Sequence, residues 1–202
     1  MSTPLTRSAA RQLWAALRML IVMTVVVGLA YPLATTGLAQ VALPGRADGS
    51  IVEKDGTPVG SSLIGQTFDA QPGYFQSRPS AAGDGYDPLA SSASNLGPEN
   101  EDLMAAIEER RQAAAELDGT DPAKVAPDAL LASGSGLDPH ISPEYAEQQV
   151  ARIARERGLP EKAVRALVEG NTGERMLGFL GEPHVNVLRL NLALDEAGEQ
   201  AD

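Results

Sequence analysis

The chain has 202 residues, no cysteine and a formal net charge of −11 at pH 7. This length suits one ordinary domain with a short additional segment, and the lack of cysteine excludes disulfides, thiolate zinc sites and iron–sulfur clusters. Residues 46–202 carry 13 of the 16 basic residues and all 27 acidic residues, which leaves this part with a net charge of −14. Because such a domain repels phosphate groups, nucleic acid is not expected as a partner.

Residues 19–45 form an uncharged segment whose core, Leu20–Ala34, is strongly apolar. A membrane-spanning helix needs about 20 mostly apolar residues, so we expect a transmembrane anchor helix over residues 15–40. A cleavable signal peptide is the alternative, because Gly37-Leu38-Ala39 offers small residues for cleavage. The uncharged segment exceeds the usual apolar region of a signal peptide, about 7–15 residues, and this favours a retained anchor.

The basic residues on either side of this segment predict its orientation. Three arginines and no acidic residue precede it, whereas Arg46 and Lys54, which follow it, lie among acidic residues. Positive charge in short loops favours the cytoplasm. We therefore predict a cytoplasmic N-terminus over residues 1–14 and a single extracytoplasmic domain over residues 41–202.

The predicted anchor has features of a docking helix and none of an ion pathway. It contains no ionisable side chain in its core, whereas ion pathways are usually marked by such groups. Ala30 and Ala34 lie four residues apart, and small residues at this spacing allow a second helix to approach closely. We therefore treat these two alanines as candidate partner contacts, and we expect Pro32 to bend or loosen the helix.

The first part of the outer domain is expected to contain a hairpin followed by an irregular segment. Residues 46–68 contain β-forming residues on either side of Asp55-Gly56, a strong hairpin signal. Residues 69–98 are rich in Gly, Ser, Pro and Ala, as flexible segments often are. Because they also contain Tyr74 and Phe75, we expect an ordered irregular loop rather than a disordered linker.

Helices are predicted in the second half of the chain from their end signals, with two candidate strands. The first should begin after an Asn N-cap and end at Gly, the second should begin after Ser-Pro, and the third follows Pro. These helices are expected at 101–118, 143–157 and 161–169; the candidate strands lie at 129–132 and 185–190, with a closing turn or helix at 191–196. Strands and helices in separate regions indicate an α+β domain.

Residue patterns associated with catalysis are weak. Ser133, Ser135, Asp138 and His140 lie within one short segment, whereas the members of a catalytic triad usually converge from distant parts of a chain. The sequence has two histidines, no P-loop motif, and no EF-hand spacing. We therefore predict no catalytic residue, no metal site and no cofactor bound by this chain itself, so that it is not an enzyme on its own.

Segments spread over most of the chain resemble one family, KdpC, the C subunit of the Kdp potassium-transporting P-type ATPase. The resemblance is thinnest over residues 101–127. The segments that carry it are Tyr31-Pro32-Leu33, Thr36–Gln40, Gly60–Phe68, Tyr74–Ala81, Ser94-Asn95-Leu96, Ser135–Pro143 and Val185–Asp195.

The resemblance implies an accessory subunit of a bacterial inner-membrane complex for high-affinity potassium uptake. Its expected partners are the channel subunit KdpA, the pump subunit KdpB and the small subunit KdpF, and ATP and potassium would be handled by the complex. In this family the C subunit is described as a catalytic chaperone that raises the ATP affinity of the pump subunit. Gln149 matches the glutamine linked with that role, although the predicted topology places it outside the cell, away from cytosolic ATP.

Tyr74, Phe75 and Arg78 are the candidate interface residues of the outer domain. Aromatic residues and arginine are favoured at interface centres. The sequence leaves open whether the two aromatic residues instead pack in the domain's own core and Arg78 pairs internally. Two other functions also remain at this point: an extracytoplasmic binding module unrelated to potassium transport, and a secreted hydrolase.

Overall fold

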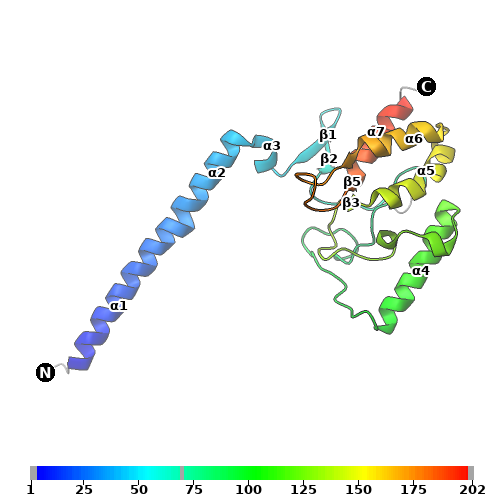
Figure 1. The fold of residues 1–202 in the computed structure, drawn as a ribbon. Helices are drawn as coiled ribbons and strands as arrows, with labels where there is room; N and C mark the ends of the chain where they lie inside the picture. The colour runs from blue at the N-terminus through cyan, green and yellow to red at the C-terminus, as the bar shows by residue number, and fades with distance from the viewer. Residues whose placement is uncertain (1–3, 69–70, 200–202) are drawn as a thin grey trace. The chain divides into compact units, whose positions relative to one another are not determined.

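A computed structural model of the chain describes residues 4–68 and 71–199. The chain divides into a helical N-terminal unit, residues 1–50, and a larger unit of helices and strands, residues 51–202 (Figure 1). The mixture of helices and short strands in the second unit agrees with the predicted α+β class.

The N-terminal unit is built around one long helix. It runs through α1 (Pro4–Met23), the π-helical stretch η1 (Thr24–Ala30) and α2 (Tyr31–Ala42), and the short helix α3 (Pro44–Ala47) follows a break at Leu43. The predicted range 15–40 lies inside this long helix. By length and composition, residues Ser8–Ala42 could cross a membrane.

The π-helical stretch ends two residues before Pro32, so the helix is disturbed close to the proline, as expected. Proline lacks an N–H, and its ring crowds the carbonyl four residues earlier, here that of Gly28. The Tyr31 N–H donates to the Val26 carbonyl five residues back, and the Thr35 hydroxyl donates to the carbonyls of Tyr31 and Pro32, each at 3.0 Å. The wider turn accommodates the proline ring without ending the helix.

The predicted hairpin is confirmed. Strand β1 (Ile51–Lys54) pairs antiparallel with β2 (Thr57–Ser61), and Lys54 lies opposite Thr57. The two loop residues, Asp55 and Gly56, have φ values of 51° and 74°. A two-residue loop with positive φ at both positions is the arrangement that Asp-Gly favours, because its twist matches that of the strands.

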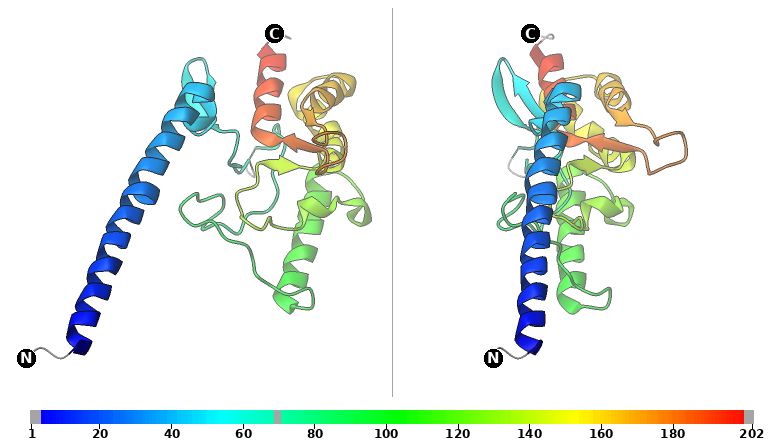
Figure 2. Two further views of the ribbon diagram at one scale, coloured as in Figure 1. Left: turned by 60° about the vertical axis from the view of Figure 1, so that its left-hand side comes forward. Right: turned by 90° about the vertical axis from the view of Figure 1, so that its left-hand side faces the viewer.

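A second, three-stranded sheet lies among the helices. Its strands are β3 (His140–Ile141), β4 (Thr172–Gly173) and β5 (His184–Asn186), in the order β3-β5-β4, with both pairings antiparallel. The connection from β4 to β5, residues 174–183, extends away from the rest of the unit (Figure 2).

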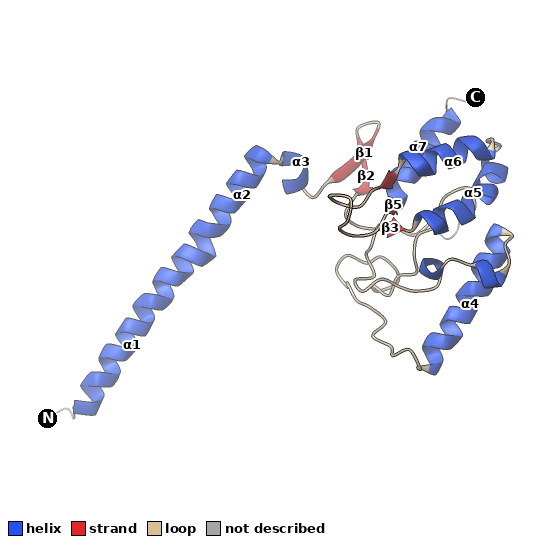
Figure 3. Ribbon diagram, in the orientation of Figure 1, coloured by secondary structure: helices blue, strands red, loops and turns tan. Residues whose placement is uncertain are grey.

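The predicted starts of two helices are confirmed, because the side chains of Asn100 and Ser142 cap them. Within the described residues, the α-helices of this unit are α4 (Glu101–Asp118), α5 (Pro143–Arg157), α6 (Glu161–Gly170) and α7 (Val187–Glu199) (Figure 3). The Asn100 side chain accepts two backbone N–H groups at the start of α4, and the Ser142 hydroxyl accepts the Tyr145 N–H at the start of α5. Gly119 and Gly158 end these two helices, each with a φ of 67°.

Two predicted strands are wrong in whole or in part. Residues 129–132 contain no strand, since Pro127–Ala129 forms a 3₁₀ turn in which the Leu130 N–H bonds the Pro127 carbonyl. The strand predicted at 185–190 stops at Asn186, and α7 begins at the next residue, Val187. The Asn186 side chain accepts the Arg189 N–H at 3.1 Å, and this local bond favours a helix start over a longer strand.

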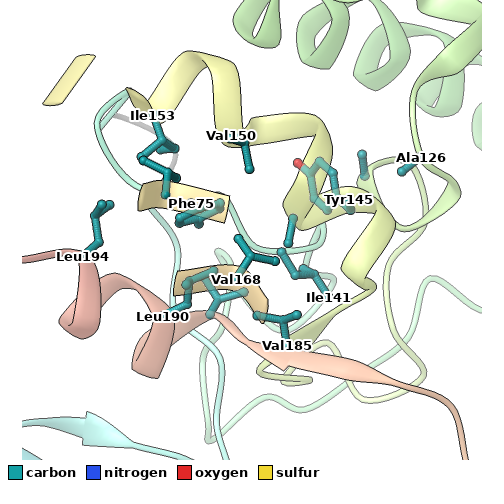
Figure 4. Packing of buried hydrophobic residues seen from close by; sticks show 14 of the residues in the cluster. Phe75, Ala126, Ile141, Tyr145, Val150, Ile153, Val168, Val185, Leu190 and Leu194 are labelled. Atoms are coloured by element: carbon teal, nitrogen blue, oxygen red, sulfur yellow. The ribbon is translucent and has the colours of Figure 1, made fainter. Parts of the chain in front are cut away.

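The hydrophobic core is formed by α5, α6, α7, β3 and β5, with Phe75 from the irregular segment lying among them (Figure 4). Phe75 is fully buried, so its ring packs in the domain's own core, which is one of the two alternatives that the sequence left open. Among the described residues, the large apolar side chains with an exposed fraction of 0% are Phe75, Ile153, Val164, Val185, Leu190 and Leu194.

Candidate functional site

Two buried carboxamide side chains hydrogen-bond to the backbone of residues 75 and 76, in the way that the backbone of a neighbouring β-strand would. Gln149, from α5, accepts the Gln76 N–H at 2.6 Å and donates to the Gln76 carbonyl at 3.3 Å. Asn191, from α7, makes the same pair of bonds with Phe75, at 2.8 Å and 3.0 Å. Each amide therefore satisfies both backbone groups of one residue, which would otherwise be buried without partners. Two helices thus fix the backbone beside the Phe75 ring.

A buried arginine extends this network. Arg152 donates through Nε to Asp118 Oδ1 at 2.8 Å and through Nη2 to Gln149 Oε1 at 2.6 Å. Its Nη1 donates to the carbonyls of Tyr74, at 3.0 Å, and Pro72. The side chains of Arg152 and Asp118 are 0% and 2% exposed. A buried ion pair needs such additional hydrogen bonds, because desolvation of the two charges offsets their attraction.

These bonds define what Gln149 can do in this conformation. Its carboxamide is fully buried, its oxygen accepts two hydrogen bonds and its nitrogen donates one. A nucleotide would reach it only after the loop at residues 72–76 had moved away. The geometry therefore makes Gln149 a positioning residue for this loop.

Tyr74 lies at the margin of the same loop, beside a cluster of charges. Its ring is 5.7 Å from that of Phe68, and the Arg157 guanidinium lies 4.3 Å from its centre. Arg157 and Lys54 both contact Asp195, at 2.8 Å and 3.3 Å. Burial alone would raise the pKa of Asp195, but its interactions with Tyr74, Arg157 and Lys54 lower that pKa overall. The cluster joins β1 to α5 and α7.

Arg78 binds groups of its own domain. Its Nη1 contacts Asp138 Oδ2 at 3.1 Å, and Nε and Nη2 donate to the Leu131 carbonyl at 3.4 Å and 3.3 Å. A quarter of its side chain stays exposed, at the edge of an open groove of about 520 Å³ between the loop at 76–86 and α4. Burial would raise the pKa of Asp138, but bonds from His140 and the charge of Arg78 lower it overall.

The structure therefore brings Tyr74, Phe75, Arg78 and Gln149 into one region, organised around residues 72–78. The other two candidates, Ala30 and Ala34, lie in the N-terminal unit, at the end of η1 and in α2, and both are exposed. They form the small-residue positions of the candidate spanning helix.

The segment with serine, aspartate and histidine forms a turn. Ser135 Oγ accepts the Leu137 N–H and lies 3.4 Å from Ser133 Oγ. His140 instead contacts Asp138 at 3.1 Å and packs edge-on against His184. Among the described residues, no group of three metal-binding side chains comes together.

Sequence reasoning missed Asn191, Arg152 and Asp118 as members of the network. Asn191 has a detectable signature, because it lies on the face of α7 that also carries the buried residues Val187, Leu190 and Leu194. A polar residue at an apolar position of a helix is a candidate for a buried hydrogen bond. For Asp118 no comparable pattern exists, since it is the last residue of α4.

The fold defines a protein with one candidate spanning helix and a separate acidic domain of helices and short strands. Residues 13–196 match the family model described as KdpC: K+-transporting ATPase, c chain. The chain therefore belongs to the KdpC family, the c chain of the K+-transporting ATPase.

Curated relatives agree along almost the whole chain. A potassium-transporting ATPase KdpC subunit of Kineococcus radiotolerans is 62% identical over 187 residues, covering 93% of this chain and 94% of the relative. The protein of the same name from Sorangium cellulosum is 55% identical over 90% of this chain and 96% of its own length. That of Mycobacterium tuberculosis is 52% identical over 92% and 98%.

Proposed function

We propose that this chain is a non-catalytic accessory subunit of an ATP-driven high-affinity potassium uptake complex. In that complex it would assemble with and stabilise the channel subunit KdpA and the pump subunit KdpB, beside KdpF. The family match over residues 13–196 carries the proposal. The polar groups of the candidate site support it, because Gln149, Asn191 and Arg152 are all used in holding one loop.

The proposal includes a single-pass topology in a bacterial inner membrane. Residues 15–40, which lie within the helix Ser8–Ala42, would be the retained anchor, with residues 1–14 in the cytoplasm and the acidic domain in the periplasm. The asymmetry of basic residues supports this orientation. Ala30 and Ala34 would then be available for contact with a helix of a larger subunit.

An effect on ATP affinity would be indirect in this arrangement. A periplasmic Gln149 and cytosolic ATP lie on opposite sides of the membrane, so the chaperone role would be a coupling free energy between two sites of the complex. Gln149 would contribute by keeping the loop at 72–78 in its shape. The second candidate function, a membrane-anchored binding module unrelated to potassium transport, is favoured by no observation on this chain.

Co-purification tests the proposal. The full chain is produced together with the other Kdp subunits, the complex is isolated from native membranes through a tag on the pump subunit, and its potassium-stimulated ATPase activity is measured with and without this chain. We expect this chain in the complex and a higher KM for ATP when it is omitted. Absence of this chain from the purified complex would contradict the proposed assembly. An unchanged KM for ATP would contradict the proposed chaperone role.

A further inference from the structure

The connection between β4 and β5 carries a cluster of exposed apolar side chains, which we call the apolar tip. Met176, Leu177, Phe179 and Leu180 have exposed fractions of 72%, 78%, 70% and 48%. Isolated exposed apolar residues are ordinary on soluble domains, but a contiguous group of large ones marks a surface for interaction. Here four of five consecutive residues are large, apolar and exposed.

The tip is held in one shape by its own backbone. Met176 and Leu180 exchange two backbone hydrogen bonds, both at 2.9 Å, and the Gly178 N–H donates to the Arg175 carbonyl at 3.0 Å. Below the tip, Arg175 and Glu182 are joined by an ion pair at 2.5 Å. Such a preformed loop loses little conformational freedom when it binds, which favours affinity.

The conformation of Leu177 adds a second reason. Its φ is 54°, in the left-handed region that branched and bulky residues rarely adopt. Leu177 is also among the most exposed side chains of the domain, so its placement gains little from packing within the chain. Backbone strain at an exposed apolar residue is typical of a site where another molecule supplies the compensating contacts.

Charge distinguishes between a lipid and a protein as the occupant. Loops and helices that bind anionic membranes combine apolar residues with several lysines or arginines. The tip is flanked by Glu174 and Glu182 against a single Arg175, and residues 46–202 carry a net charge of −14. This charge opposes approach to an anionic lipid surface and leaves a protein pocket as the favoured occupant.

Chain connectivity limits the length of the link between the long helix and the domain that carries the tip. Eight residues separate the end of α2 at Ala42 from the start of β1 at Ile51, a span of at most about 29 Å. If the long helix crosses the membrane, the domain stays close to the outer faces of the other membrane subunits. We propose that the apolar tip docks into an apolar pocket on a membrane subunit of the same complex. This inference rests on the proposed function.

Photo-crosslinking identifies what the tip touches. The chain has no cysteine, so Leu177→Cys provides a single site for a benzophenone maleimide in the purified complex. Leu89→Cys is the matched control, because Leu89 is 95% exposed in a different loop. We expect illumination to join Leu177→Cys, and not Leu89→Cys, to another subunit type, identified by mass spectrometry. Crosslinks to lipid alone, to a second copy of this chain, or equally from both sites would overturn the proposal.

A second measurement tests the energetic contribution. Phe179→Ser in the full chain should lower the ratio of this chain to the pump subunit after detergent purification by about ten-fold or more. Leu89→Ser should leave the ratio unchanged. If the wild-type chain does not co-purify, the proposed function itself fails. If wild type and Phe179→Ser co-purify equally, only the docking inference fails.

Discussion

Gln149 and Asn191 illustrate, at the scale of single residues, how a buried amide can replace a strand. Both lie on the apolar faces of their helices, and each bonds the N–H and the carbonyl of one residue in the loop. The loop needs this support because it passes through the interior without a neighbouring strand. Its order therefore depends on side chains more than 70 residues away in sequence.

Replacement of Gln149 tests this role. Gln149→Ala leaves a buried backbone N–H and carbonyl and one Arg152 N–H without a partner, and we expect a loss of about 2–3 kcal/mol in the free energy of unfolding. Urea unfolding of the detergent-solubilised full chain measures it. Gln112→Ala, on the exposed side of α4, should change stability by less than about 0.5 kcal/mol. Unchanged stability together with a raised KM for ATP would point to direct functional contact.

Arg78 was predicted as a candidate interface residue, but it makes an ion pair and hydrogen bonds within its own domain. Its charge-assisted bonds to Asp138 and the Leu131 carbonyl connect its own loop to the loop at residues 130–139. We expect Arg78→Ala to lower the free energy of unfolding by about 1–2 kcal/mol, measured by thermal denaturation of the full chain. Arg155→Ala, whose side chain is 64% exposed, is the control and should have little effect. Normal stability with failed assembly would instead assign Arg78 to an interface.

At the scale of elements, one carboxylate links three pieces of secondary structure. Asp195 of α7 contacts Arg157 at the end of α5 and Lys54 at the end of β1. Short strands such as β1 and β2 contribute few ladder bonds, and an isolated two-stranded hairpin is marginally stable. The Lys54 contact therefore ties the hairpin to the helical part of the domain.

This arrangement predicts a pH dependence. The pKa of folded Asp195 is lowered, whereas an unfolded aspartate titrates near 3.9. A group with a lowered folded pKa stabilises the protein above its unfolded pKa, and that contribution is lost as pH falls through the folded value. We expect Asp195→Asn to cost about 1 kcal/mol at pH 7 and less below about pH 4. Urea midpoints between pH 7 and pH 3 measure the difference, and curves that stay parallel would contradict this role.

At the scale of the whole molecule, the long helix makes a topology experiment decisive. Leu89→Cys introduces the only cysteine of the chain at a fully exposed loop position. We expect it to react with a membrane-impermeant maleimide in cells whose outer barrier alone is permeabilised, and the labelled product should keep its full-length mass. Labelling only after lysis of the inner membrane would reverse the topology, and loss of the first ~39 residues would establish a cleaved signal peptide.

The sequence by itself determined the features that depend on neighbouring residues. Asp55-Gly56 specified the hairpin turn, Asn100 and Ser142 specified two helix starts, and Gly119 and Gly158 specified two helix ends. These predictions succeed because turn and cap conformations depend on a few adjacent side chains. The uncharged N-terminal segment likewise identified the long apolar helix from composition alone.

Only the tertiary structure decided which residues that are far apart in the sequence bind each other. The interior position of Phe75 and the roles of Gln149 and Asn191 depend on which segments lie side by side. A polar residue in a sequence shows that it needs a hydrogen-bond partner but not where that partner lies. The partners here are backbone groups of a loop far away along the chain, and folding alone brings them together.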